Sequence, residues 1–170
     1  ALRQMRELRS LGHEVHVVLP GPGSLVSSYE QAGVNVHFIT VDLAKLRKIS
    51  RFLTARLELR ALVAQLNPDL LHSHFVGTTM FARLALGRNS GPRRIFQVPG
   101  PLHLETPWVR RAELATSGSA DFWLGSFKLT CDIYRSCGIN PDRLGLSFYG
   151  TDIARMQKGT AGRLRPGLKL

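Results

Sequence analysis

The sequence predicts a doubly wound α/β domain built around a parallel β-sheet. Short apolar segments of strand length alternate with longer segments of helical periodicity along the 170 residues. The strand segments are apolar along most of their length, which is typical of strands covered by helices on both faces. Because 44% of the residues are hydrophobic, the chain suffices for one domain with a real core.

The first half of the chain alternates three helices with three strands. Leu2, Met5 and Leu8 recur at helical spacing before the stop signal Gly12. The strand that follows ends at a proline, the second helix ends at a glycine, and an Asn-Pro pair closes the third helix. The predicted helices cover residues 2–11, 25–33 and 43–66, and the predicted strands cover 14–20, 34–41 and 69–74.

The second half repeats this alternation, with the turn RNSGPR between a helix and a strand. The predicted helices cover 78–86, 108–116 and 127–138, and the predicted strands cover 94–99, 121–126 and 143–150. Residues 1–152 form the predicted domain. Segment 153–170 is basic, rich in glycine and without apolar periodicity, so it is expected to be a linker or the start of a further domain.

The formal charge of +11 favours anionic partners. Nucleic acid is not expected, because the aromatic residues do not alternate with basic ones and no zinc-finger or helix-turn-helix spacing is present. Cys131 and Cys137 match neither a disulfide framework nor a zinc spacing. No apolar run approaches the roughly 20 residues of a membrane span, and no cleavable signal is visible, so a cytoplasmic location is expected.

The predicted helix 43–66 carries six basic residues against one acid, Glu58. That combination with apolar residues suits an anionic membrane surface, whereas a solvated helix with a few exposed apolar residues is the alternative. Its basic residues are Lys45, Arg47, Lys48, Arg51, Arg56 and Arg60. The expected core stripe is Leu43, Leu46, Leu53, Leu57, Ala61 and Ala64, which leaves Phe52 and Leu59 among the basic residues.

Ligands of doubly wound sheets collect at the carboxyl ends of the strands. His72 and His74 stand at such an end and share a face, because side chains two apart in a strand point the same way. They are candidates for the polar lining of a cleft. The alternatives are a metal site, for which no third ligand is evident nearby, and a pair of satisfied core histidines. Ser126, at the end of a later strand, is a further candidate.

The stretch FQVPGPLHLE at 96–105 begins like a buried strand and runs into two prolines and a glycine. These residues are expected to end the strand and stiffen a loop, which holds His103 and Glu105 over the cleft at low ordering cost. His103 can donate a hydrogen bond to a substrate hydroxyl or phosphate, and Glu105 can orient it or bind a hydroxyl. Alternatively, Glu105 caps the next helix and His103 pairs only with backbone.

The turn GPGS after the first predicted strand partly matches a dinucleotide-binding fingerprint. Gly21 and Gly23 would supply the glycines, and Asp42 falls about 20 residues later, where an acid would bind a ribose. The third glycine is absent, with Val26 in its place, and Pro22 removes a backbone donor. A plain tight turn is therefore the preferred interpretation.

Taken in order, these pieces resemble the amino-terminal half of glycosyltransferase family 4, the retaining nucleotide-sugar transferases of the GT-B fold. The matching pieces span most of the chain, and the PGPLHLE version looks like enzymes that build bacterial surface polysaccharides. The matching pieces are RELRSLGHEVHVVLP, PGSLVSSYEQAGVNVHFI, NPDLLHSHF, FQVPGPLHLE and GINPDRLGLSFYGTDI.

The resemblance implies a Rossmann-like, acceptor-side half of a two-domain enzyme that needs no metal or other cofactor. Its donor would be a UDP- or GDP-sugar, and its acceptor a saccharide or a lipid-linked glycan. The resemblance implies that His103 is the catalytic residue and lies beside the reacting sugar. Members commonly dock on the inner membrane face, which favours a peripheral membrane role for helix 43–66. The candidate substrate-binding residues are His72, His74, Gly100, Glu105 and Ser126.

The chain also departs from the family pattern. Set against that pattern, the sequence is expected to lack the first, central strand with its glycine-rich loop and the donor domain with its paired glutamates. A fragment with unpaired strand edges is therefore expected, one that does not transfer sugar alone. The rival interpretations are an NAD-type Rossmann binding domain, a nucleotide-sugar epimerase of the GT-B fold, and an inert truncation product.

Overall fold

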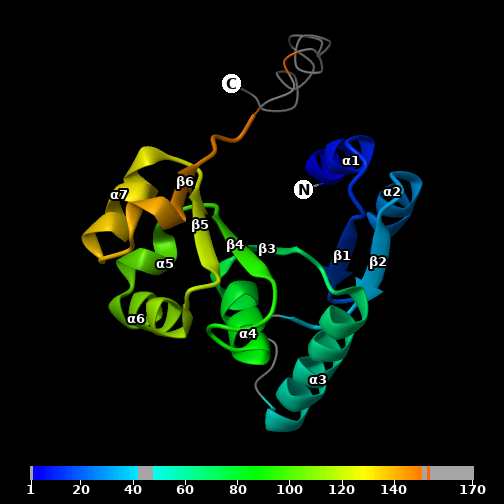
Figure 1. Ribbon diagram of the computed structural model, residues 1–170, viewed down its shortest axis with the longest axis horizontal. Helices are drawn as coiled ribbons and strands as arrows, with labels where there is room; N and C mark the ends of the chain where they lie inside the picture. Colours follow the sequence, from blue (N-terminus) through cyan, green and yellow to red (C-terminus); the bar gives the residue numbers. More distant parts are fainter. Residues whose placement is uncertain (1, 42–47, 151–152, 154–170) are drawn as a thin grey trace, which may run out of the picture.

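The computed structural model describes residues 2–41, 48–150 and 153. Helices and strands alternate along the chain as the sequence predicts (Figure 1). The helices are α1 (Leu2–Ser10), α2 (Val26–Gln31), α3 (Ile49–Leu66), α4 (Val76–Leu86), α5 (Leu102–Glu105), α6 (Pro107–Thr116) and α7 (Lys128–Ser136). The strands are β1 (His16–Leu19), β2 (Asn35–Phe38), β3 (Leu70–His74), β4 (Arg93–Val98), β5 (Asp121–Gly125) and β6 (Leu144–Leu146), the last preceded by the 3-10 turn η2 (Pro141–Arg143).

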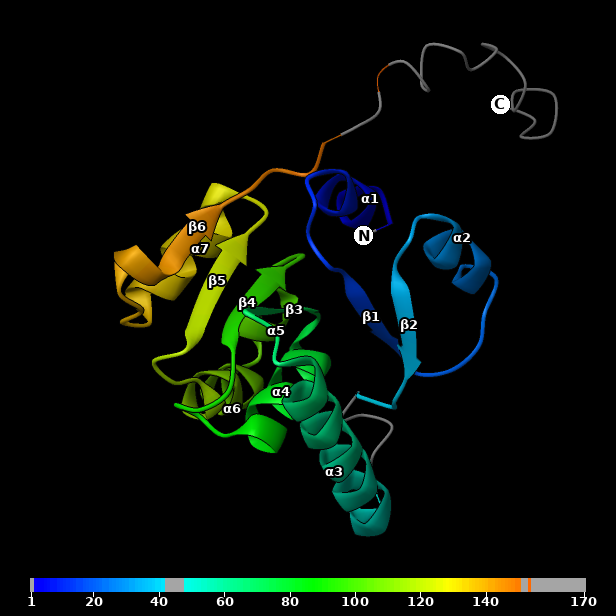
Figure 2. The same ribbon diagram turned by 45° about the vertical axis from the view of Figure 1, so that its right-hand side comes forward.

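The strands pair only in parallel, within the described residues, and form two separate sheets (Figure 2). β1 pairs with β2, and β3, β4, β5 and β6 follow one another in the second sheet. The predicted α/β class with a parallel, Rossmann-like arrangement is confirmed. No hydrogen-bonded pairing joins β1 or β2 to β3 within the described residues, so the two sheets are separate.

Helices α4, α6 and α7 cover one face of the four-stranded sheet. Ser73 of β3 is in register with Phe96 of β4, which is in register with Trp123 of β5. Side chains of register partners point to the same face, so these three residues define the helix-covered face. The contacts that place the helices on it are Ser73 with Thr79 of α4, and Trp123 with both Glu113 of α6 and Tyr134 of α7.

Among the described residues, the core consists of three clusters that follow the layers of the fold. One lies between α3 and α4, one between the four-stranded sheet and α5 to α7, and one around the β1–β2 sheet. The second cluster supports the carboxyl ends of β4 and β5. Its buried members are Phe96, Val98, Leu104, Trp123 and Tyr134.

The predicted core stripe of the long helix is wrong. Leu59 of α3 is only 4% exposed, and Phe52 packs edge-on against Phe81 of α4 at 5.7 Å between ring centroids. Leu53 and Leu57 are instead 47% and 67% exposed. The small residues Ala82 and Ala85 of α4 leave room for the bulky side chains of Phe52 and Leu59. Helix propensities do not reveal this fit between two helices. Ala61 and Ala64 are also exposed, whereas Leu43 and Leu46 lie outside the described residues.

A short helix replaces the loop that the sequence predicts at PGPLHLE. Pro101 precedes the first turn, and Leu104 is 1% exposed within the core cluster beneath α5. Burying Leu104 between β4 and α7 stabilises one helical turn, which the sequence interpretation missed.

The predicted linker lies outside the described residues except for Ile153, as do Thr151 and Asp152. None of the described helices combines the length and apolar character needed to cross a bilayer.

Candidate functional site

The loops after β4 and β5 meet at the carboxyl edge of the four-stranded sheet. β3 to β6 run in parallel, so their carboxyl ends lie along the same edge (Figure 1). The buried Ser126 donates a hydrogen bond from Oγ to the Val98 carbonyl at 2.8 Å. A side chain at Gly100 would contact the Phe127 ring at 4.0 Å. Two of the predicted site residues, Gly100 and Ser126, are therefore neighbours at this edge.

His103 lies on α5 next to this junction and is half-buried. Its Nε2 is 3.0 Å from the Tyr134 hydroxyl of α7, and its ring lies 5.7 Å from the Phe96 ring of β4. Phe96 belongs to the helix-covered face of the sheet, so the His103 ring packs over that face at its carboxyl end. In this conformation Nε2 is engaged by the protein. A substrate contact would therefore use another edge of the ring or replace the Tyr134 hydroxyl.

Buried charged side chains lie next to Trp123, whose ring packs against Tyr134. The Glu113 Oε1 atom accepts hydrogen bonds from Arg83 Nη1 at 2.6 Å and from Trp123 Nε1 at 3.0 Å. Arg83 also donates from Nε to Asp121 at 3.0 Å, and Arg94 donates from Nε to the same oxygen at 2.9 Å. The positive charges of the two arginines and the negative charges of the two carboxylates thus compensate one another, since a buried charge requires a paired partner.

Burial lowers the pKa of His103, although the Glu113 charge and a hydrogen bond to the Gly100 backbone act in the opposite direction. Burial also raises the pKa of Tyr134, and the Glu113 charge raises it further. His103 is therefore neutral and Tyr134 protonated at pH 7. A neutral imidazole beside a hydroxyl can accept or donate one proton, so the tautomer of His103 depends on Tyr134.

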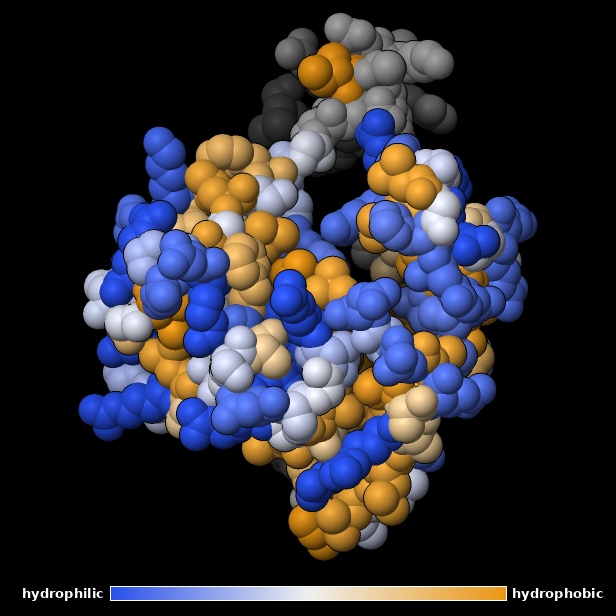
Figure 3. Space-filling model, in the orientation of Figure 1, coloured by the Kyte–Doolittle hydropathy of each residue, from blue (hydrophilic) through white to orange (hydrophobic). Residues whose placement is uncertain are grey.

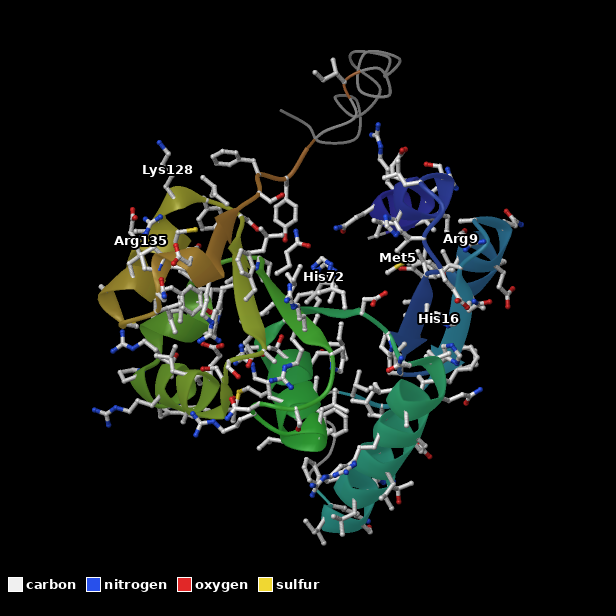
Figure 4. All side chains as sticks on the ribbon, in the orientation of Figure 1. Met5, Arg9, His16, His72, Lys128 and Arg135 are labelled. Carbon is white, nitrogen blue, oxygen red and sulfur yellow. The ribbon has the colours of Figure 1, made fainter. Side chains whose placement is uncertain are left out.

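His72 and His74 point to the face of the sheet opposite the one that His103 contacts. Both flank Ser73 on β3, and Ser73 shares the face of Phe96, so strand alternation turns the two histidines away from it. Figure 4 shows His72 on the side of β3 and β4 away from α5, α6 and α7. The structure therefore does not bring the histidine pair together with the His103 ring, although all three lie near the carboxyl edge.

The His72 and His74 rings stack on each other at 4.7 Å between centroids. Burial, and secondarily the neighbouring His74, lower the pKa of His72 to about 4, while the Gln97 side chain opposes this shift. The buried Nε2 of His72 and Oε1 of Gln97 lack hydrogen-bond partners within the described residues. No group of three His, Cys, Asp or Glu side chains close enough to hold a metal ion occurs there either. The pair is thus a neutral, polar surface that suits a hydroxyl-bearing ligand.

Neither Glu105 nor the GPGS turn, which the sequence favours as a plain tight turn, contacts His103 among the described hydrogen bonds and ring contacts. Glu105 ends α5 with an exposed side chain, and the residue that precedes α6 is Thr106. Gly21 and Gly23 both have open space where a side chain would lie, so no part of the protein packs closely against either glycine. Asp42 lies outside the described residues.

Phe75 is an unusual residue at the same edge. It links β3 directly to α4 with a φ of 65°, a left-handed value that is rare for a bulky side chain, and it is 66% exposed. Strained residues of this kind occur at functional sites. Nothing in the sequence around Phe75 signals this conformation.

Tyr134 and Glu113 are the contacts of the candidate site that the sequence analysis missed. Tyr134 shares a buried helix face with Thr130 and Cys131, and this i, i+1, i+4 spacing was a signal for burial. Glu113 has no such signal, because a glutamate within a helix is ordinarily assigned to the solvent side. Its burial is explained by partners on other elements, Arg83 of α4 and Trp123 of β5, which donate hydrogen bonds to its carboxylate.

Comparisons with known proteins agree with this fold. The family model described as Glycosyltransferase Family 4 matches residues 1–155. The crystal structure of a glycosyltransferase from Rickettsia africae ESF-5 is similar, with a TM-score of 0.65 and 12% sequence identity. The similarity covers 99% of this chain and 44% of that protein, so this chain spans less than half its length. At such low identity the likeness concerns the fold.

No curated protein sequence matches the chain. The family match extends over more than half of the residues and includes every described strand, among them the strands that carry His72, His74 and the segment before His103. This chain belongs to glycosyltransferase family 4.

Proposed function

We propose that the chain is the acceptor-side half of a retaining glycosyltransferase. The full-length protein would transfer a hexose-type sugar from a UDP- or GDP-sugar to a hydroxyl of a saccharide or lipid-linked acceptor, in the synthesis of bacterial surface polysaccharide. The observation that carries this proposal is the family match over 1–155. The meeting of Gly100, Ser126 and His103 at the carboxyl edge of the sheet supports it, because ligands of this fold class bind at that edge.

The proposed catalysis is largely electrostatic. As the bond between sugar and phosphate opens, positive charge develops on the sugar and negative charge on the leaving phosphate. Preorganised dipoles that face each charge lower the barrier, and a neutral His103 is suited to the sugar side, since it adds no positive charge there. The proposal invokes no metal or other cofactor, and a lone domain of this kind would not transfer sugar.

The test is to incubate the full-length protein with UDP- and GDP-sugars and a glycan acceptor, and to measure nucleoside diphosphate release and glycan extension. Extension of the acceptor is expected. A freed epimer without extension would instead support the epimerase alternative. Binding of NAD in preference to the sugar nucleotides would support the dinucleotide alternative, which the absence of the third fingerprint glycine, with Val26 in its place, does not favour.

A membrane-facing role for α3 is part of the proposal. Ile49, Leu53 and Leu57 follow one another four residues apart on its outer face, and all three are exposed. Arg56 and Arg60 lie on the same helix. Figure 3 shows apolar residues gathered over the end of α3 that is drawn lowest, beside hydrophilic ones. An apolar stripe next to basic residues suits the headgroup region of an anionic bilayer on its cytoplasmic side.

Replacing Leu53 and Leu57 together by serine is expected to weaken binding to vesicles that contain anionic lipid by at least about tenfold, because apolar area is lost from the contact. Co-sedimentation of the full-length protein with vesicles measures the change. Leu129→Ser is the matched control, since Leu129 of α7 is similarly exposed at 59%. Equal binding of the double variant and the wild type would exclude this surface.

A further inference from the structure

Tyr134 contacts a ring nitrogen of His103 from a buried position in the fold. Tyr134 is completely buried, between the Trp123 ring at 5.7 Å and the His103 ring at 6.3 Å between centroids. Its aromatic ring is thus held by packing, and its hydroxyl stands 3.0 Å from His103 Nε2. A hydrogen bond from a rigid residue fixes both the direction of an imidazole and its tautomer.

Glu113 acts on Tyr134 and His103 through its charge, which raises the pKa of both groups. Glu113 Oε2 is buried and has no partner within normal hydrogen-bond distance, whereas its other oxygen, Oε1, is occupied by Arg83 and Trp123. When His103 is neutral with Nε2 unprotonated, Nε2 accepts the Tyr134 proton. When Nε2 carries a proton, it donates to the Tyr134 oxygen.

We propose that Tyr134 and Glu113 are positioning residues for His103 and form a relay with it: Tyr134 bonds the ring directly, and Glu113, held by Arg83 and Trp123, acts on the ring through its charge. This inference rests on the proposed sugar transfer only for its effect on turnover. The relay supports either protonation state of the ring without moving it, so that His103 keeps one orientation through the reaction. The charged groups around the relay are Glu113 of α6, Arg83 of α4, Asp121 of β5 and Arg94 of β4.

The primary test is Tyr134→Phe in the full-length protein, which keeps the ring and removes the hydroxyl. Turnover is expected to fall roughly five- to tenfold with little change in KM for the sugar nucleotide, as when one positioning hydrogen bond is lost. The 15N signals of the His103 ring are expected to shift, because its tautomer is no longer fixed. The matched control is Tyr29→Phe, which alters a buried tyrosine of the β1–β2 cluster.

The Glu113→Gln variant tests the second step of the relay. The Glu113 charge raises the pKa of His103, so removing it is expected to lower that pKa further in an NMR titration, with the acid limb of the rate profile moving in the same direction. An unchanged His103 titration in this variant would remove Glu113 from the relay.

Unchanged turnover together with unchanged His103 15N signals in Tyr134→Phe would overturn the inference and leave the proposed sugar transfer intact. If the wild-type protein transfers no sugar, the proposed function fails, and the 15N signals alone decide whether the relay exists. If Tyr134→Phe does not fold, the wild-type spectrum decides. A slowly exchanging Tyr134 hydroxyl proton bonded to His103 Nε2 supports the relay, and its absence contradicts it.

Discussion

Replacing His103 by alanine is expected to lower the turnover of the full-length protein by about two orders of magnitude or more, the usual effect of removing a group that acts on the transition state. The ring stands on α5 at the junction of the β4 and β5 loops, where Gly100 and Ser126 also lie. KM for the sugar nucleotide is expected to change far less, because the donor phosphates are proposed to bind elsewhere in the protein. Steady-state kinetics with a glycan acceptor measure both quantities.

The control for this prediction is His13→Ala, which removes an exposed imidazole before β1. Circular dichroism and thermal unfolding of both variants show whether the fold is kept. The His103→Ala change removes the hydrogen-bond partner of the Tyr134 hydroxyl, so a small decrease in the free energy of unfolding is expected. Near-normal turnover in a folded His103→Ala protein would remove His103 from the site.

Replacing Asp121 by alanine is expected to destabilise the domain by about 3–5 kcal/mol, a large share of the roughly 5–15 kcal/mol of an ordinary domain. The Asp121 carboxylate accepts hydrogen bonds from Arg83, Arg94 and the Gly118 backbone, and it is 3% exposed as a residue. Its loss leaves two buried guanidinium groups without one of their counter-ions. Chemical denaturation of the full-length protein, followed through the buried Trp123, measures the change.

Asp132→Ala provides the matched control. Asp132 pairs with Arg135 on the surface of α7, where the two side chains are 61% and 52% exposed. Exposed pairs of this kind contribute roughly 0–1 kcal/mol, so only a small change is expected. Similar losses of unfolding free energy in the two variants would contradict the role of Asp121 as the counter-ion of the buried Arg83 and Arg94.

The order of helices and strands could be predicted from the sequence because each strand is a short apolar run between clear turn signals. Residues 69–74 and 121–126 are examples, and β3 and β5 occupy them within one residue. The register of α3 could not be predicted. That helix has apolar residues on more than one face, and only the small residues of α4 decide that Phe52 and Leu59, rather than Leu53 and Leu57, are buried.

The site could be predicted only in part. Strand ends identified His103, Gly100 and Ser126 as neighbours, because parallel strands bring their carboxyl ends to one edge. The sequence could not show that His103 packs over the helix-covered face while His72 and His74 point to the other. That difference depends on the path of the chain after Val98, which turns into α5 because Leu104 is buried.

The most direct test of sugar transfer with retention is the anomeric configuration of the product. The full-length protein is incubated with a 13C-labelled UDP- or GDP-sugar and a glycan acceptor, and NMR identifies the new glycosidic bond. A bond with the same anomeric configuration as the donor, formed together with free nucleoside diphosphate, is the predicted result. An inverted bond would contradict retention, and the absence of any glycosidic product with every nucleotide sugar tested would contradict the proposed activity itself.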